Sequence, residues 1–127
     1  MEDTTNLDER TPAASADGHD GGVTLINSFV VPAGREDAFQ ELWTEASNYF
    51  RAQPGYVALR LHRALTPDAR YRFVNVARWA TASQFYAAHD TDEFRRVVGQ
   101  PAWREFPSNP TLYEVIVEHD APTPARV

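Results

Sequence analysis

The residues YRFVNVARW at positions 71–79 form the stretch that decides the fold of this chain of 127 residues. Successive side chains of a β-strand point to opposite faces, so residues four apart, such as Asn75 and Trp79, share a face. One face of this predicted strand is aromatic and apolar with a single amide in its middle, and it consists of Tyr71, Phe73, Asn75, Ala77 and Trp79. A buried amide needs hydrogen-bond partners. Asn75 is therefore either a satisfied structural residue or a residue that binds a ligand.

A long helix and three more strands are predicted around this stretch. Apolar residues recur at intervals of three and four over residues 35–53, which predicts an amphipathic helix. Pro54 and Gly55 are predicted to end this helix. Alternating or continuous apolar residues predict strands at positions 23–31, 56–64 and 111–118, and the short turn after the second of these makes a hairpin with residues 71–79.

Two short helices are predicted between residue 80 and residue 100. Thr81 or Ser83 begins the first, and Thr91 or Asp92 begins the second, because these residue types cap helix N-termini. Residues 101–110 contain three prolines, Trp103 and Phe106, and are predicted to form a loop that packs over the rest of the domain.

The resulting order β-α-β-β-α-β is that of a ferredoxin-like α+β fold, an antiparallel sheet with helices on one face. The second face of that sheet is predicted to carry Ile26, Val30, Val74, Val76 and Ile116 beside Arg60, His62, Arg72 and Arg78. Such a face is too apolar to be left to solvent, so we expect a homodimer that packs sheet against sheet.

Charge is unevenly distributed along the chain. Residues 1–22 hold six acidic residues and one arginine and have no aromatic residue or periodicity, which predicts a disordered N-terminal tail. Residues 23–118 hold eleven acidic residues and ten arginines and are predicted to form one domain, while residues 119–127 form a C-terminal tail. A nearly neutral domain predicts neither a nucleic-acid partner nor a membrane surface.

Composition narrows the chemistry. The chain has no cysteine, which excludes thiolate ligands and a cysteine nucleophile, and no lysine, which excludes Schiff-base catalysis. It has no histidine motif with metal-ligand spacing, no G-x-S-x-G elbow and no G-x-G-x-x-G loop, so no metal site is expected. The sequence contains no apolar run of membrane-spanning length and no basic start followed by an apolar segment, and a cytoplasmic location is expected.

Three short motifs occur within residues 23–118: Asn27 seven residues before Gly34, the entry Pro54-Gly55-Tyr56 into a strand, and Trp79 followed by Phe85 and Phe94. Together they resemble the antibiotic biosynthesis monooxygenase family. The resemblance implies a dimeric α+β barrel.

Two branches of that family differ in chemistry. Haem-degrading members have an asparagine that Asn27 matches, but their tryptophan and histidine-ligand positions fall by spacing on Ala88 and Val98. Cofactor-free anthrone and quinol oxygenases carry an asparagine and a tryptophan four residues apart, which Asn75 and Trp79 match. Those oxygenases also use a pocket tyrosine where this chain has Phe85; Tyr49, Tyr56, Tyr71, Tyr86 and Tyr113 are the alternatives, and the sequence does not choose among them.

The function predicted is therefore oxidation of an aromatic, polyketide-like anthrone, phenol or quinol by O₂ without a cofactor, in secondary metabolism. The predicted catalytic residues are Asn75 and Trp79 as hydrogen-bond donors and His89 as a base, although His89 can equally be a surface or helix-capping histidine. The predicted substrate contacts are Asn27, Phe73, Phe85 and Tyr71. The alternatives are a non-oxidative cyclase or isomerase of a polyketide and a haem- or small-ligand-binding protein without turnover.

Overall fold

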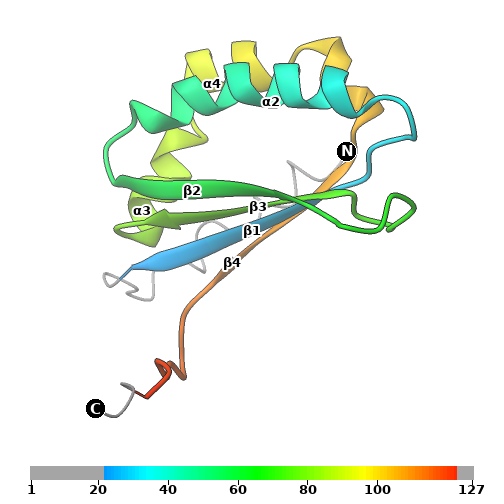
Figure 1. The fold of residues 1–127 in the computed structure, drawn as a ribbon. Coiled ribbons are helices and arrows are strands. Elements are labelled where there is room, and N and C mark those ends of the chain that lie inside the picture. Colours follow the sequence, from blue (N-terminus) through cyan, green and yellow to red (C-terminus); the bar gives the residue numbers. More distant parts are fainter. Residues whose placement is uncertain (1–21, 123–127) are drawn as a thin grey trace.

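The protein is an antiparallel four-stranded sheet covered on one face by helices, as the computed structural model of residues 22–122 shows (Figure 1). The strands lie in the order β2-β3-β1-β4, so α2 carries the chain from β1 across to β2 and leaves room for β3 between them. The predicted α+β, ferredoxin-like fold is confirmed. In order, the elements are β1 (Val23–Phe29), α2 (Glu36–Arg51), β2 (Tyr56–Arg63), β3 (Phe73–Trp79), α3 (Ala82–Ala88), α4 (Asp92–Val98), the 3₁₀ helix η1 (Pro101–Glu105) and β4 (Ser108–Tyr113).

Side-chain caps start the two short helices. The hydroxyl of Thr81 accepts a hydrogen bond from the backbone N–H of Gln84 at 3.0 Å, and that of Thr91 accepts one from Phe94 at 2.9 Å. Each threonine satisfies a helix N–H that has no partner within the helix. Of the residues that the sequence left open as caps, the structure uses these two threonines.

The turn between α2 and β2 depends on a glycine. Gly55 has a φ of +88°, a conformation that residues with a Cβ adopt at a cost. A Cβ at this position would also collide with the side chain of Gln84 at the start of α3. Gly55 therefore permits both the turn and the close approach of α3 to β2.

The last strand lies earlier in the chain than predicted. Residues 111–118 were expected to form it, whereas β4 is Ser108–Tyr113 and the segment after it leaves the sheet (Figure 1). Tyr113 pairs with Thr24, almost at the start of β1, so the apolar residues that follow run past the end of the strand that could pair with them. Ile116 is consequently 82% exposed and does not belong to the second face of the sheet as predicted.

The expected place of Tyr71 needs correction, and β2 is irregular near its start. Strand β3 begins at Phe73, and Tyr71 lies in a bend before it rather than on the strand face. A β-bulge between Tyr56 and Ala58 changes which side chains of β2 face the helices. Tyr56 rather than Val57 packs against the core with Leu59, and Val57 is 49% exposed.

The core consists of two hydrophobic clusters at opposite ends of the sheet. The first cluster includes Val23, Leu25, Ala77, Trp79 and Phe85, and the second includes Phe29, Val31, Phe39, Phe73 and Phe106. Along both β1 and β3 the residue between the two clusters is an asparagine, Asn27 or Asn75. A pair of amides therefore separates the two apolar regions on the central strands, while the neighbouring residues in this row are Leu61 on β2 and Pro110 on β4.

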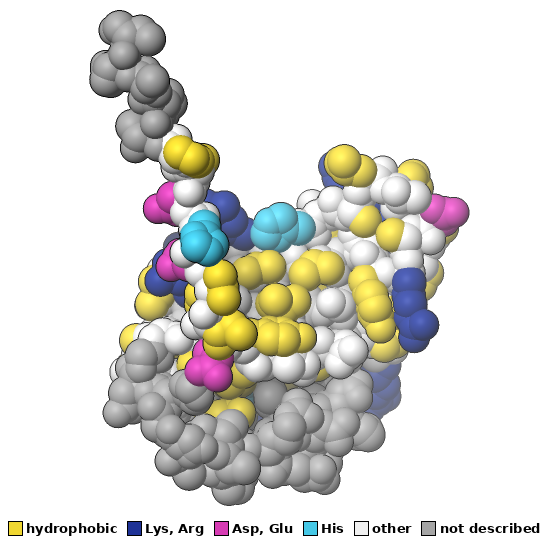
Figure 2. All heavy atoms as spheres, turned by 90° about the horizontal axis from the view of Figure 1, so that it is seen from below, with side chains coloured by type: hydrophobic (Ala, Val, Ile, Leu, Met, Phe, Trp, Pro, Cys, Tyr) yellow, Lys and Arg dark blue, Asp and Glu magenta, His cyan; other side chains and the backbone are white. Residues whose placement is uncertain are grey.

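The face of the sheet away from the helices is not covered by any described residue of the chain. Figure 2 shows hydrophobic side chains gathered over the strands on this face. The side chains of Ile26, Val74 and Val76 alternate with the buried ones and are half-buried. These three residues are called the open face below.

The predicted tails fall mostly outside the described residues. Of the N-terminal tail at 1–22 only Gly22 is described, and of the C-terminal tail at 119–127 residues 119–122 are described and have no regular secondary structure. Among the described helices, none has the length and apolar character needed to cross a membrane.

Candidate active site

A cavity of about 600 Å³ lies between the sheet and the helices. Its wall is mainly apolar and aromatic, as is usual for sites that bind small organic molecules. The lining residues come from all four strands, from α2, α3 and α4, and from η1 and the turns on either side of it. All three tryptophans of the chain, Trp43, Trp79 and Trp103, line it.

Asn27 and Asn75 lie directly opposite each other on β1 and β3, in the wall of this cavity. The Oδ1 atoms of both side chains are buried and have no hydrogen-bond partner among the described residues. Leaving a buried polar atom without a partner costs about 1–3 kcal/mol, so such atoms are rare in native proteins. No described residue supplies a partner for either oxygen, and both residues line the cavity.

Trp79 and Phe85 lie at the end of the cavity formed by the first cluster. Trp79 is 2% exposed, and its ring meets Phe50, Tyr56 and Phe85 edge to face, with centroids 6.4, 5.9 and 5.7 Å away. Such contacts hold the indole in one orientation. The structure thus brings Trp79 and Phe85 into one cavity with the asparagine pair.

His89 follows α3 and lines the same end of the cavity. Its ring lies against Phe85, Phe94 and Phe50, with centroids 4.1, 4.8 and 5.1 Å away. Burial among these rings lowers the pKa of His89 to about 4, although the contact with the Phe85 carbonyl acts in the opposite direction.

The tautomer of His89 follows from one hydrogen bond. Its Nδ1 lies 2.7 Å from the carbonyl oxygen of Phe85, which can only accept, so Nδ1 carries the proton of the neutral ring. Nε2 is then the nitrogen with a free lone pair. A neutral imidazole with one free nitrogen can act as a proton acceptor.

Phe73 and Tyr71 do not line the cavity. Phe73 is 1% exposed and packs on Phe39 with ring centroids 4.7 Å apart, within the second hydrophobic cluster. Tyr71 lies in the bend before β3, and the guanidinium of Arg70 lies 5.3 Å from its ring centroid. The structure does not bring these two residues to the asparagine pair.

Among the tyrosines left open by the sequence, only Tyr56 is part of the cavity wall in the described chain. The hydroxyl of Tyr49 lies 2.6 Å from both the carbonyl oxygen of Ala88 and the hydroxyl of Thr91. Tyr49 therefore ties α2 to the connection between α3 and α4.

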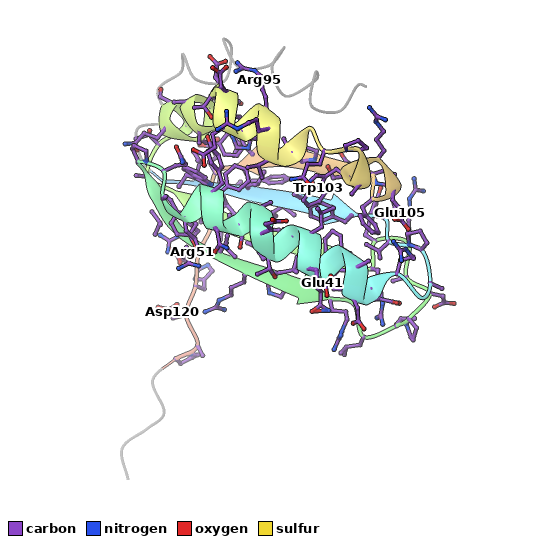
Figure 3. All side chains as sticks on the ribbon, turned by 90° about the horizontal axis from the view of Figure 1, so that it is seen from above. Glu41, Arg51, Arg95, Trp103, Glu105 and Asp120 are labelled. Atoms are coloured by element: carbon purple, nitrogen blue, oxygen red, sulfur yellow. The ribbon has the colours of Figure 1, made fainter. Side chains whose placement is uncertain are left out.

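The second end of the cavity was missed from the sequence. Trp103 of η1 lines it together with Trp43 and Phe106, and Figure 3 shows Trp103 between α2 and the segment that carries η1. The Nε1 of Trp103 is buried and has no hydrogen-bond partner among residues 22–122. An aromatic residue within a proline-rich stretch was the available signal, but its position over the sheet depends on tertiary packing.

No cluster of three or more metal-binding side chains occurs among the described residues. The position that matches the histidine ligand of haem-degrading proteins by spacing is Val98, and its aliphatic side chain lines the cavity. An aliphatic side chain cannot bind iron, so the residues do not fit a haem held at that position.

Comparisons with known proteins show the family and the fold. The model of the antibiotic biosynthesis monooxygenase family matches residues 22–100. Deoxynogalonate monooxygenase from Streptomyces nogalater is 33% identical over 93 residues, which are 72% of this chain and 69% of that protein. A crystal structure of a candidate monooxygenase from Shewanella loihica PV-4 is 36% identical, covers 77% of this chain and 97% of its own, and has a TM-score of 0.68. SnoaB from Streptomyces nogalater, a cofactor-independent oxygenase, is 25% identical, with 77% and 96% covered and a TM-score of 0.66.

Proposed function

Because the chain belongs to the antibiotic biosynthesis monooxygenase family, we propose that it oxidises an aromatic, polyketide-like substrate with O₂ and without a cofactor. The substrate would be an anthrone, a phenol or a quinol formed in secondary metabolism. The observation that carries the proposal is the pair of amides with buried, unpartnered Oδ1 atoms, Asn27 and Asn75, whose residues line an aromatic cavity with Trp79 and His89.

The named relatives support this choice of chemistry. One is called a deoxynogalonate monooxygenase and another a cofactor-independent oxygenase. Both activities suit a cavity whose wall offers amides, indoles and one imidazole.

The reaction needs only the substrate and O₂. An anthrone loses a proton from its central carbon to give an electron-rich anion, which passes one electron to O₂. The carbon radical and superoxide combine to a peroxide on that carbon, which takes up a proton and loses water to leave a carbonyl. One oxygen atom of O₂ is thereby added to carbon and the other is released as water.

The chain would assist this reaction in two ways, by accepting the proton of the substrate and by stabilising the oxyanion that results. His89 is neutral, and its free Nε2 accepts the proton that the substrate loses. Its low pKa makes it a weak base, but the substrate anion that forms beside it stabilises the imidazolium. The indole N–H of Trp79 and the carboxamide NH₂ groups of Asn75 and Asn27 are donors suited to the substrate oxyanion. The aromatic wall, which includes Phe85, excludes water.

We also propose that the open face is the interface of a homodimer. A half-buried apolar surface over a sheet is costly to expose to water, and a second copy provides a surface of matching character. A cytoplasmic location remains a prediction from the sequence.

Oxygen consumption tests the function. Purified protein mixed with an anthrone or a dihydroquinone, with a chelator and without added metal or flavin, should consume O₂ in proportion to product. Asn75→Ala and Trp79→Phe should lower this rate at least tenfold while the protein stays folded and still binds the aromatic product.

Other results would redirect the assignment. Consumption of substrate without consumption of O₂ would point to a cyclase or isomerase in the same cavity. A Soret band of stoichiometric intensity on titration with haem, together with no O₂ consumption, would contradict the cofactor-free oxygenase.

A further inference from the structure

Trp103 lines the cavity and carries an unsatisfied hydrogen-bond donor. Its Nε1 is buried, and no acceptor for it exists among the described residues. An indole nitrogen can only donate, so the missing partner has to be an acceptor atom. Neither the predicted site nor the oxidation chemistry above uses this group.

Contacts with neighbouring residues hold Trp103 in place. Its ring lies 6.2 Å from Phe29 and 6.3 Å from Phe39, centroid to centroid, and it meets Phe39 edge to face. Glu105, two residues along η1, binds Arg35 through two hydrogen bonds of 2.5 and 3.0 Å. These contacts tie η1 to the start of α2, so the buried donor belongs to a preorganised wall.

Trp103 and Trp79 occupy opposite ends of the cavity. Trp79 pairs with Val23 at the start of β1, and Trp103 packs on Phe29 at the other end of that strand. Six residues of β-strand separate these two rows, a backbone distance of roughly 20 Å. The unpartnered oxygens of Asn27 and Asn75 lie between the two ends.

We propose that Trp103 binds an oxygen substituent of the substrate at the end of the cavity away from Trp79. The substrate class that fits is an elongated, fused-ring aromatic with oxygen at both ends. One oxygen belongs to the ring that is oxidised beside Trp79 and His89, and the other accepts the hydrogen bond of Trp103. A hydroxyl group suits the second position, because its oxygen can accept a hydrogen bond from the indole N–H.

This inference deepens the proposed function and rests on it for the identity of the cavity as the substrate site. Its test uses binding rather than turnover, so the two can fail separately. The probes are 9,10-anthraquinone and 2-hydroxyanthraquinone, which share one ring system, differ in one outer oxygen and are not oxidised further at the central ring. The test requires only that this hydroxyl reach Trp103, not that the three-ring probe span both ends of the cavity.

Calorimetric titration of the wild-type protein should show about tenfold tighter binding of the hydroxylated probe, the usual effect of one buried neutral hydrogen bond. Trp103→Phe should bring the ratio of the two affinities close to one, because phenylalanine keeps an aromatic ring but has no N–H. Trp43→Phe is the matched control, since it removes an indole from the same end of the cavity while Trp103 remains, and it should keep the ratio.

An unchanged ratio in Trp103→Phe would overturn the proposal, and so would the failure of both probes to bind the wild-type protein. If Trp103→Phe does not fold, 2-methylanthraquinone replaces the variant, and equal binding of the methyl and hydroxyl probes to the wild-type protein overturns it equally. O₂ consumption measured in parallel separates the two ideas. If Trp103→Phe binds both probes equally but the wild-type protein consumes no O₂, the binding role of Trp103 is confirmed and the oxygenase function is contradicted.

Discussion

At the scale of single residues, a substitution at Asn75 distinguishes a structural role of this residue from a functional one. Asn75→Leu removes an unpartnered buried oxygen and places an apolar side chain into a cavity with room for it. We expect the free energy of unfolding to rise by about 1–3 kcal/mol, while O₂ consumption falls at least tenfold. Thermal and denaturant unfolding measure the first effect and an oxygen electrode the second.

Asn109→Leu is the control for this experiment. Asn109 is an exposed residue on the edge strand β4, so its replacement should leave stability within about 0.5 kcal/mol of the wild type. A loss of stability in Asn75→Leu would mean that Asn75 is an ordinary structural asparagine with satisfied hydrogen bonds.

His89 makes the stability of the protein depend on pH. Its pKa is lowered from 6.5 to about 4 by burial, so between these values the unfolded chain binds a proton that the folded chain does not. The stabilisation is complete above pH 6.5 and is lost as the pH falls toward 4, with a total of about 3 kcal/mol.

The wild-type protein should therefore lose stability between pH 6.5 and pH 4 relative to His89→Gln, which has no titrating group at this position. Chemical unfolding at half-unit steps of pH measures the difference. His119→Gln, in the exposed C-terminal segment, controls for the loss of a histidine. Parallel curves for wild type and His89→Gln over this range would show that the imidazole is not buried in the folded protein.

At the scale of secondary-structure elements, the two glycines with positive φ have different surroundings. Gly34 and Gly55 have φ values of +85° and +88°, but a Cβ on Gly34 would meet nothing within 4 Å, whereas one on Gly55 would collide with Gln84. Gly34→Ala should cost about 1 kcal/mol of stability, the backbone strain alone. Gly55→Ala should cost roughly 1–3 kcal/mol more, because α3 has to move away from β2.

Denaturant unfolding of both variants measures this difference. Since α3 carries Phe85 and leads into His89, Gly55→Ala should also weaken binding of an aromatic ligand, and Gly34→Ala should not. Equal destabilisation by the two substitutions would contradict a close packing of α3 on the turn.

Helices with strong local sequence signals were predictable, whereas the position of β4, which depends on pairing with β1, was not. The period of α2 and the starts of α3 and α4 are properties of neighbouring residues, so the sequence alone indicated them. It offered two cap residues for each short helix, and the structure uses the threonines. Residues 114–118 have the alternation of a strand, but β1 starts at Val23, so they run past the strand that could pair with them. Instead β4 includes Pro110, which an edge strand tolerates because its missing N–H need not pair.

At the scale of the whole molecule, the open face leads to a prediction about assembly. Val76→Arg places a charge on a half-buried apolar position of the exposed side of the sheet and should convert a dimer into monomers at micromolar concentration. Light scattering after gel filtration measures the mass. Leu65→Arg is the matched control, because Leu65 is 98% exposed in the turn between β2 and β3. A wild-type protein that is monomeric at micromolar concentration would contradict the sheet-to-sheet dimer.

The sequence by itself determined the α+β class, the faces of β1 and β3 and the presence of Asn27, Asn75 and Trp79 on one side, because strand alternation is a local property. It also carried the family, through short motifs spread over residues 27–94. Only the tertiary structure decided that Phe73 lies in the core and that Tyr71 lies outside the cavity. The same packing buries His89 among three phenylalanines and brings Trp103 over the sheet. Cavity walls are built from residues distant in sequence, and the environment that sets a pKa or leaves a donor unpartnered exists only after those residues have packed.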